Sequence, residues 1–141
     1  MNYQNDDFFK QLLSMFKLEA EEHIGVIKSA LSKMQETLSD SERTELLESV
    51  FRAAHSLKGA AGTVGLTDIE PIGQSLENVF SIMKNKKLDC SNELFNMLNK
   101  SIQMLDVLIS SINEQGKILK DKSELIRLID KINEHMVLVG A

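Results

Sequence analysis

Apolar side chains recur at steps of three and four residues along most of the chain, the spacing that gathers them on one face of an α-helix. This pattern predicts five helices, over residues 6–38, 42–61, 68–85, 91–115 and 122–138. The expected inward positions of the first helix are Phe8, Leu12, Phe16, Ala20, His23 or Ile24, Ile27, Leu31, Met34 and Leu38. With one proline and 5% aromatic residues, the chain lacks the turns and β-forming residues of a sheet protein. We therefore expect an all-α fold.

Polar residues with capping spacing mark the predicted helix ends. Three pairs have the spacing of a capping box: Ser39 with Glu42, Thr67 with Glu70, and Asp121 with Glu124. Asn5 or Asp6 can cap the first helix, and Ser91 the fourth. Because glycine is a poor helix former, the segment from Gly62 to Gly65 is expected to end the second helix, and Gly116 follows the fourth.

The predicted connections are short, which favours an antiparallel arrangement of consecutive helices. The simplest packing is an up-and-down four-helix bundle with a fifth, accessory helix. A chain of 141 residues with 43% apolar content suits one hydrophobic core, so residues 1–141 are expected to form a single domain. No heptad seam with flanking charges stands out, and we expect a monomer.

Composition narrows the possible partners and the compartment. Sixteen Lys and Arg against twenty-one Asp and Glu leave a net charge of −5, which argues against nucleic-acid binding. A single cysteine suits a reducing compartment. No apolar run approaches the roughly 18 to 20 residues of a membrane span, and the polar start of the chain does not resemble a signal peptide. We expect a cytoplasmic domain that does not insert into a membrane.

Metal and hydrolytic chemistry find little support in the residue pattern. A di-iron helical bundle requires a glutamate three residues before a ligating histidine. None of the three histidines, His23, His55 and His135, has one. Three histidines also do not define a catalytic triad by spacing alone. We expect no metal site and no hydrolytic centre.

The segment Arg52–Gly62 departs from what helix packing alone requires. His55 lies about 110° from the centre of the buried stripe on a helical wheel, with Gly59 and Gly62 in the same row. Each glycine costs about 1 kcal/mol relative to alanine in a helix, so two beside one histidine suggest close approach by a partner. Lys58 can bring its ammonium over the same patch, and a neutral imidazole is a nucleophile near pH 7. The pattern indicates a phosphoryl acceptor at His55.

A purely structural interpretation remains open on the residue pattern alone. His55 can be an ordinary histidine at the edge of the core, and Lys58 can lay its aliphatic stem along the surface. Gly59 and Gly62 can be contact points for a crossing helix or part of a frayed helix end.

A resemblance to a known protein family favours the phosphoryl-acceptor interpretation of His55 over the purely structural one. The segment Phe51–Leu66 resembles the signature of histidine-containing phosphotransfer (HPt) domains, most closely the N-terminal phosphotransfer domain of CheA-type chemotaxis sensor kinases and their hybrid relatives. Phe16 and the run Glu19–Ile24 resemble the first helix of such domains. The segments Ile69–Glu70 and Leu76–Phe80 resemble the helix that faces the histidine. The five-helix order agrees, so the resemblance covers nearly the whole chain.

The resemblance implies a phosphoryl carrier. A kinase catalytic domain would phosphorylate His55 on Nε2 with ATP, and His55 would pass the group to an aspartate of a response-regulator receiver domain. The carrier would have no ATP site or cofactor of its own, because the partner domains supply ATP and Mg²⁺. Lys58 matches the family's lysine beside the phosphohistidine. Glu77 matches the glutamate that accepts the Nδ1–H of the imidazole.

Gln74 departs from the CheA-type pattern, which often has a second histidine at this position. Phosphorelay-type HPt domains resemble this chain in having glutamine there. Glutamine can form hydrogen bonds but does not titrate, and we expect Gln74 to orient His55 or its phosphate. The parent protein would be a CheA-type sensor kinase or a stand-alone relay protein. The alternative is a bundle that docks to a receiver as an adaptor without being phosphorylated.

Overall fold

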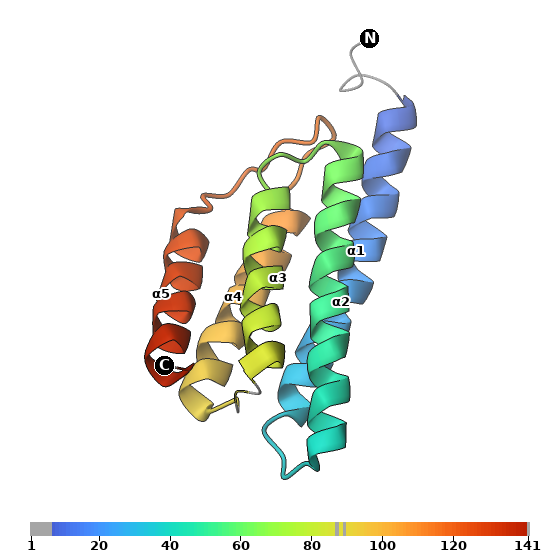
Figure 1. Ribbon diagram of the computed structural model, residues 1–141. Coiled ribbons are helices and arrows are strands. Elements are labelled where there is room, and N and C mark those ends of the chain that lie inside the picture. The colour runs from blue at the N-terminus through green and yellow to red at the C-terminus, as the bar shows by residue number, and fades with distance from the viewer. Residues whose placement is uncertain (1–6, 87, 89, 141) are drawn as a thin grey trace.

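The computed structural model describes residues 7–86, 88 and 90–140, of which residues 139 and 140 are described by their backbone only. This part of the chain forms five helices and no strand: α1 (Asp7–Lys33), α2 (Asp40–Val64), α3 (Glu70–Lys86), α4 (Asn92–Ser110) and α5 (Ser123–Gly140). Consecutive helices run in opposite directions (Figure 1). The all-α expectation is therefore confirmed for the described residues.

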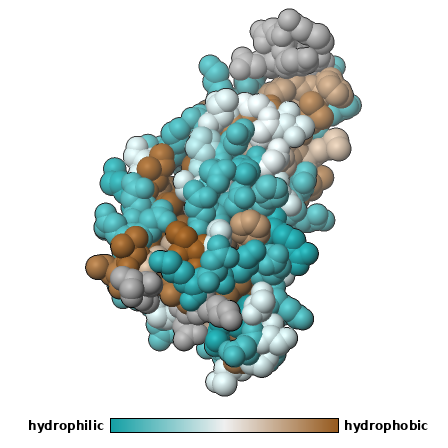
Figure 2. Space-filling model, viewed as in Figure 1, coloured by the Kyte–Doolittle hydropathy of each residue, from teal (hydrophilic) through white to brown (hydrophobic). Residues whose placement is uncertain are grey.

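The helices enclose one core. α1 packs against α2 and α4, α2 packs against α3, and α5 packs against both α3 and α4. Leu125, Ile129, Ile132 and Met136 of α5 are all buried in this core. The fifth helix thus packs against α3 and α4 through a buried apolar face. Hydrophilic residues cover most of the face formed by α2 and α3, and hydrophobic residues gather toward one end of α5 (Figure 2).

The start of α1 buries a different stripe from the one predicted. Phe9 and Leu13 are buried, whereas Phe8 is 56% exposed and Leu12 is only partly buried. An α-helix has 3.6 residues per turn, so each step of four residues rotates slightly past a full turn. Two such steps back from Phe16 reach Phe8, which no longer faces the core. α1 also ends at Lys33, earlier than predicted, and the expected cap at residues 5 or 6 lies outside the described residues.

The start of α2 confirms the first capping box. Ser39 Oγ accepts a hydrogen bond from Glu42 N at 3.1 Å, and Glu42 Oε1 accepts one from Ser39 N at 3.0 Å. Hydrogen bonds from the backbone and side chain of Ser39 to the carboxylate lower the pKa of Glu42. The two residues satisfy backbone N–H groups that the first turn of a helix otherwise leaves without partners.

The end of α2 lies beyond the predicted one, because the helix runs through Gly62 to Val64. Gly65 then ends it in the left-handed region, with φ of 80°. Leu66 N donates to Ala61 O at 2.9 Å, and both of these residues are buried. Tertiary packing on either side of Gly62 thus outweighs the low helix propensity of glycine.

The other predicted helix ends are right in part. Ser91 caps α4 as expected, but α4 ends at Ser110, and Gly116 lies in the following loop with φ of 80°. α3 begins at Glu70, and the backbone N–H of Glu70 donates a hydrogen bond to Leu66 O. The predicted cap at Thr67 is therefore not the start of this helix. Asp121 accepts hydrogen bonds from the backbone and hydroxyl of Ser123, and these lower its pKa.

Candidate functional site

His55 lies midway along α2, and its side chain is 60% exposed to solvent. Its Nδ1 is 3.0 Å from Oε1 of Glu77, which comes from α3. The antiparallel packing of these two helices brings together residues that are 22 positions apart in the chain. The imidazole is therefore held at one nitrogen by the protein while its ring remains accessible.

The carboxylate of Glu77 is largely buried, with 13% of its side chain exposed. Its Oε2 forms no hydrogen bond of acceptable angle. It does lie 2.7 Å from Lys58 Nζ, close enough for an ion pair. Burial alone would raise the pKa of Glu77, but the polar contacts and charge of Lys58 and His55 outweigh burial and lower the pKa below its ordinary value.

The charge of Glu77 determines the proton position on His55. An ionised carboxylate only accepts hydrogen bonds, so the contact with Nδ1 requires a hydrogen on Nδ1. In the neutral imidazole, Nε2 then carries the lone pair. The arrangement leaves Nε2 as the nucleophilic nitrogen of an exposed ring that is held at its other nitrogen.

Gln74 contacts Lys58 rather than His55. Lys58 Nζ donates to Gln74 Oε1 at 3.1 Å, and Gln74 Nε2 donates to Asn78 Oδ1 at 2.9 Å. Gln74 and Glu77 thus hold the ammonium of Lys58 from two sides. Any influence of Gln74 on the imidazole passes through Lys58 in this structure.

The glycines beside the histidine differ from each other. A Cβ on Gly59 would meet no heavy atom within 4 Å, so the surface next to His55 is open there. A Cβ on Gly62 would lie 2.8 Å from Oε2 of Glu70, because the turn into α3 places this carboxylate over Gly62. The surface is therefore open at Gly59, whereas the end of the exposed, flexible Glu70 side chain lies over Gly62, and partner access at the two glycines stays a prediction.

Two neighbours of the site were not assigned a role from the sequence. The ring of Phe51, one turn before His55, lies 14° from parallel to the imidazole with centroids 6.4 Å apart. Lys84 of α3 places its Nζ 4.5 Å from the centroid of the Phe51 ring and 3.2 Å from Oε2 of Glu48. The i, i+4 spacing of Phe51 and His55 was visible in the sequence, but the position of Lys84 depends on helix packing.

The other two histidines have ordinary surroundings. His23 Nε2 lies 3.3 Å from Oε1 of Glu19, and His135 Nδ1 lies 3.9 Å from Oε2 of Glu93. No group of three or more His, Cys, Asp or Glu side chains in the described residues could hold a metal ion. None of the described helices is long and apolar enough to cross a membrane.

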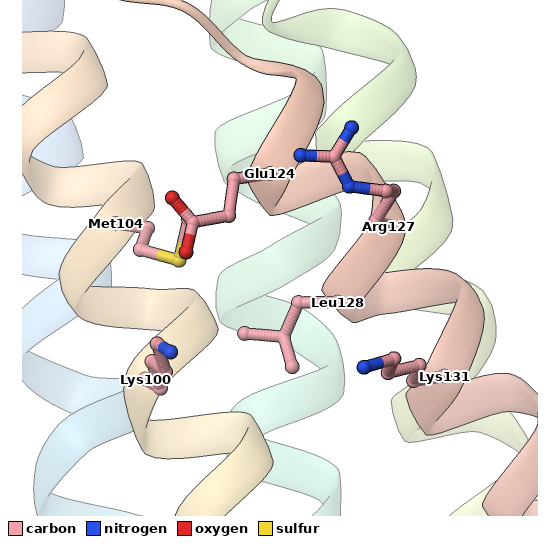
Figure 3. Close-up of a pocket in the computed structure, with 6 residues that line it drawn as sticks. All are labelled: Lys100, Met104, Glu124, Arg127, Leu128 and Lys131. Carbon is pink, nitrogen blue, oxygen red and sulfur yellow. The ribbon is translucent and has the colours of Figure 1, made fainter.

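A cavity of about 310 Å³ lies away from His55, between α4 and α5 (Figure 3). Its lining consists of Lys100, Met104, Glu124, Arg127, Leu128 and Lys131. Neither α2 nor α3 contributes to it. No ion pair joins these charged side chains within the described residues, in contrast to the connected groups around His55.

Comparisons with known proteins agree with this geometry. The family model of the Hpt domain matches residues 11–115. The chemotaxis protein CheA of Bacillus subtilis is 29% identical over 125 residues, covering 89% of this chain and 18% of that protein. The CheA proteins of Listeria monocytogenes and Halobacterium salinarum are each 25% identical, over 82% and 83% of this chain. The chain spans 18% or less of the length of these three relatives.

Proposed function

Since this chain belongs to the Hpt domain family, we propose that it is a phosphoryl carrier in which Nε2 of His55 accepts a phosphoryl group and passes it on. The donor is ATP bound to a histidine kinase catalytic domain, and the acceptor is an aspartate of a response-regulator receiver domain. The relatives are chemotaxis CheA proteins, which supports a CheA-type sensor kinase as the parent protein.

The observation that carries this proposal is the contact between His55 Nδ1 and the ionised Glu77. It holds the ring at Nδ1 and leaves the lone pair on Nε2 of a side chain that is 60% exposed. In the first transfer, Nε2 forms a bond to phosphorus as the bond to the leaving oxygen of ADP breaks. The ring becomes positively charged at this step, and the nearby carboxylate of Glu77 stabilises that charge.

The second transfer reverses the roles. The N–P bond breaks as a carboxylate oxygen of the receiver aspartate bonds to phosphorus, and the imidazole returns to its neutral form. Lys58 lies beside the ring and supplies a positive charge that can pair with the phosphoryl oxygens. The partner domains supply Mg²⁺ and ATP, so this chain contributes position and charge rather than an ATP site of its own.

The open surface at Gly59 supports approach by a kinase or receiver domain to His55. Which surfaces dock depends on the particular partner domains. We propose that the isolated domain is a cytoplasmic monomer. The net charge of −5 supports protein partners rather than nucleic acid.

The test is phosphorylation of the purified domain by phosphoramidate without a kinase. We expect one acid-labile phosphoryl group per chain in the wild type and none in His55→Gln. A phosphorylatable HPt domain serves as the control for the reagent. A folded wild type that gains no phosphoryl group would contradict the proposal and favour an adaptor that only docks to a receiver.

A further inference from the structure

The backbones of α2 and α3 lie close together at Gly73, a buried residue of α3. A Cβ on Gly73 would lie 3.0 Å from Cα, 3.1 Å from Cβ and 3.3 Å from N of Lys58. Two of these three atoms belong to the α2 backbone and cannot rotate away as the end of a long side chain can. By contrast, a Cβ on Gly25 or Gly59 would meet no heavy atom within 4 Å.

This contact lies one helical turn from the functional groups on both helices. On α3, Gly73 precedes Glu77 by four residues, and on α2, Lys58 follows His55 by three. The antiparallel helices therefore place the Gly73–Lys58 contact directly beside the pair formed by His55 and Glu77. The helix separation at this level determines whether the carboxylate reaches Nδ1 and Nζ together, at 3.0 Å and 2.7 Å.

We infer that Gly73 is a positioning residue for His55. Its missing side chain lets α3 approach α2 closely enough for the short Glu77 side chain to bind both His55 and Lys58. A side chain at this position forces the two backbones apart, lengthens the His55–Glu77 contact and weakens the preference for a hydrogen on Nδ1. The consequence for phosphorylation rests on the carrier function proposed above, but the effect on the imidazole proton does not.

The experiment measures the two imidazole ¹⁵N chemical shifts of His55 in the wild type, Gly73→Ala, Gly73→Val and Glu77→Gln. We expect the wild type to hold its hydrogen mainly on Nδ1, and the Gly73 variants to lose this preference in the order Val more than Ala. Phosphorylation by phosphoramidate should slow in the same order, by severalfold in Gly73→Val. Gly25→Ala is the matched control, since it replaces an exposed helical glycine that contacts nothing and should leave both readouts unchanged.

The outcomes separate this inference from the proposed function. An unchanged proton position in folded Gly73→Val would overturn the inference, even if the protein were less stable. If Gly73→Val does not fold, the same decision falls to Gly73→Ala, whose smaller side chain still lies within 3.0 Å of the α2 backbone. A wild type that is never phosphorylated, with the proton shift present in the variants, would refute the carrier function and leave Gly73 as a positioning residue.

Discussion

The α2–α3 face and the α4–α5 cavity both gather charged side chains, but they organise them differently. Around His55, a buried carboxylate contacts both an imidazole and an ammonium. In the α4–α5 cavity, Lys100, Arg127 and Lys131 line an open space with Glu124, and no ion pair joins them in the described part of the chain (Figure 3). Desolvation strengthens electrostatic interactions, so the first arrangement can control a proton and a charge. The number of charges does not by itself distinguish a functional site.

Removing the Glu77 carboxylate should have the largest effect on the difference between the two regions. In Glu77→Ala, His55 loses the acceptor for Nδ1–H and Lys58 loses its ion pair, so phosphorylation should slow by about 10²-fold. The rate with phosphoramidate measures this effect. Glu124→Ala in the α4–α5 cavity is the matched control and should keep the wild-type rate. Equal rates for wild type and Glu77→Ala would contradict the role assigned to Glu77.

Filling the open surface should block the protein partner. Gly59→Leu places a large side chain where the proposed receiver domain would approach His55, and we expect transfer to fall by about tenfold or more. The assay follows loss of phosphate from the domain to a receiver chosen because it accepts phosphate from the wild type. Helix content should remain intact, since leucine is the better helix former. Normal transfer from Gly59→Leu would refute the access argument.

A comparison of two lysines tests the electrostatic contrast directly. Lys58→Met removes the ammonium beside His55 and should slow phosphorylation by roughly five- to tenfold, the scale of one charge-assisted contact. Lys131→Met removes an ammonium from the α4–α5 cavity and should change the rate less than twofold. Equal effects of the two substitutions would show that the net charge of the domain, rather than the position of Lys58 beside His55, determines the rate of phosphorylation.

The pH dependence of stability should distinguish Glu77 from a solvated carboxylate. Its pKa is lowered in the folded protein, so the unfolded chain binds more protons, and the stabilisation is present above the ordinary value of 4.5 and lost as pH falls through the lowered pKa. Urea unfolding of Glu77→Gln should show a smaller loss of unfolding free energy in this acid range than the wild type. Some acid sensitivity remains, because Glu42 and Asp121 also have lowered pKa values. Identical pH slopes would contradict the geometry of Glu77.

The smallest effect is expected at Gln74. Gln74 contacts the Lys58 ammonium and not the imidazole, so Gln74→Ala should slow phosphorylation by only about two- to threefold. The same phosphoramidate assay measures it, with Asn78→Ala as a second variant in the chain of hydrogen bonds. A rate unchanged in Gln74→Ala would remove Gln74 from the site.

Much of the fold could be predicted because helix period and capping are short-range properties. The capping box of Ser39 and Glu42 and the cap at Ser91 need only neighbouring residues, and both are present. The end of α2 was predicted wrongly because local propensity at Gly62 gives way to the packing of Ala61 and Leu66. The start of α1 was predicted wrongly for a different reason: repeated steps of four residues drift around the helix, so the extrapolated stripe reached Phe8, whereas Phe9 is buried.

The amino-acid sequence by itself determined the helices and the row on α2 that carries His55, Lys58 and Gly59, because one helical period places them together. The resemblance to HPt domains added Glu77 as the expected partner of the imidazole. Only the tertiary structure decided how α3 meets α2: it brought Glu77 to His55, placed Glu70 over Gly62 and pressed Gly73 against Lys58. These contacts depend on the separation and register of two helices, which no local pattern contains.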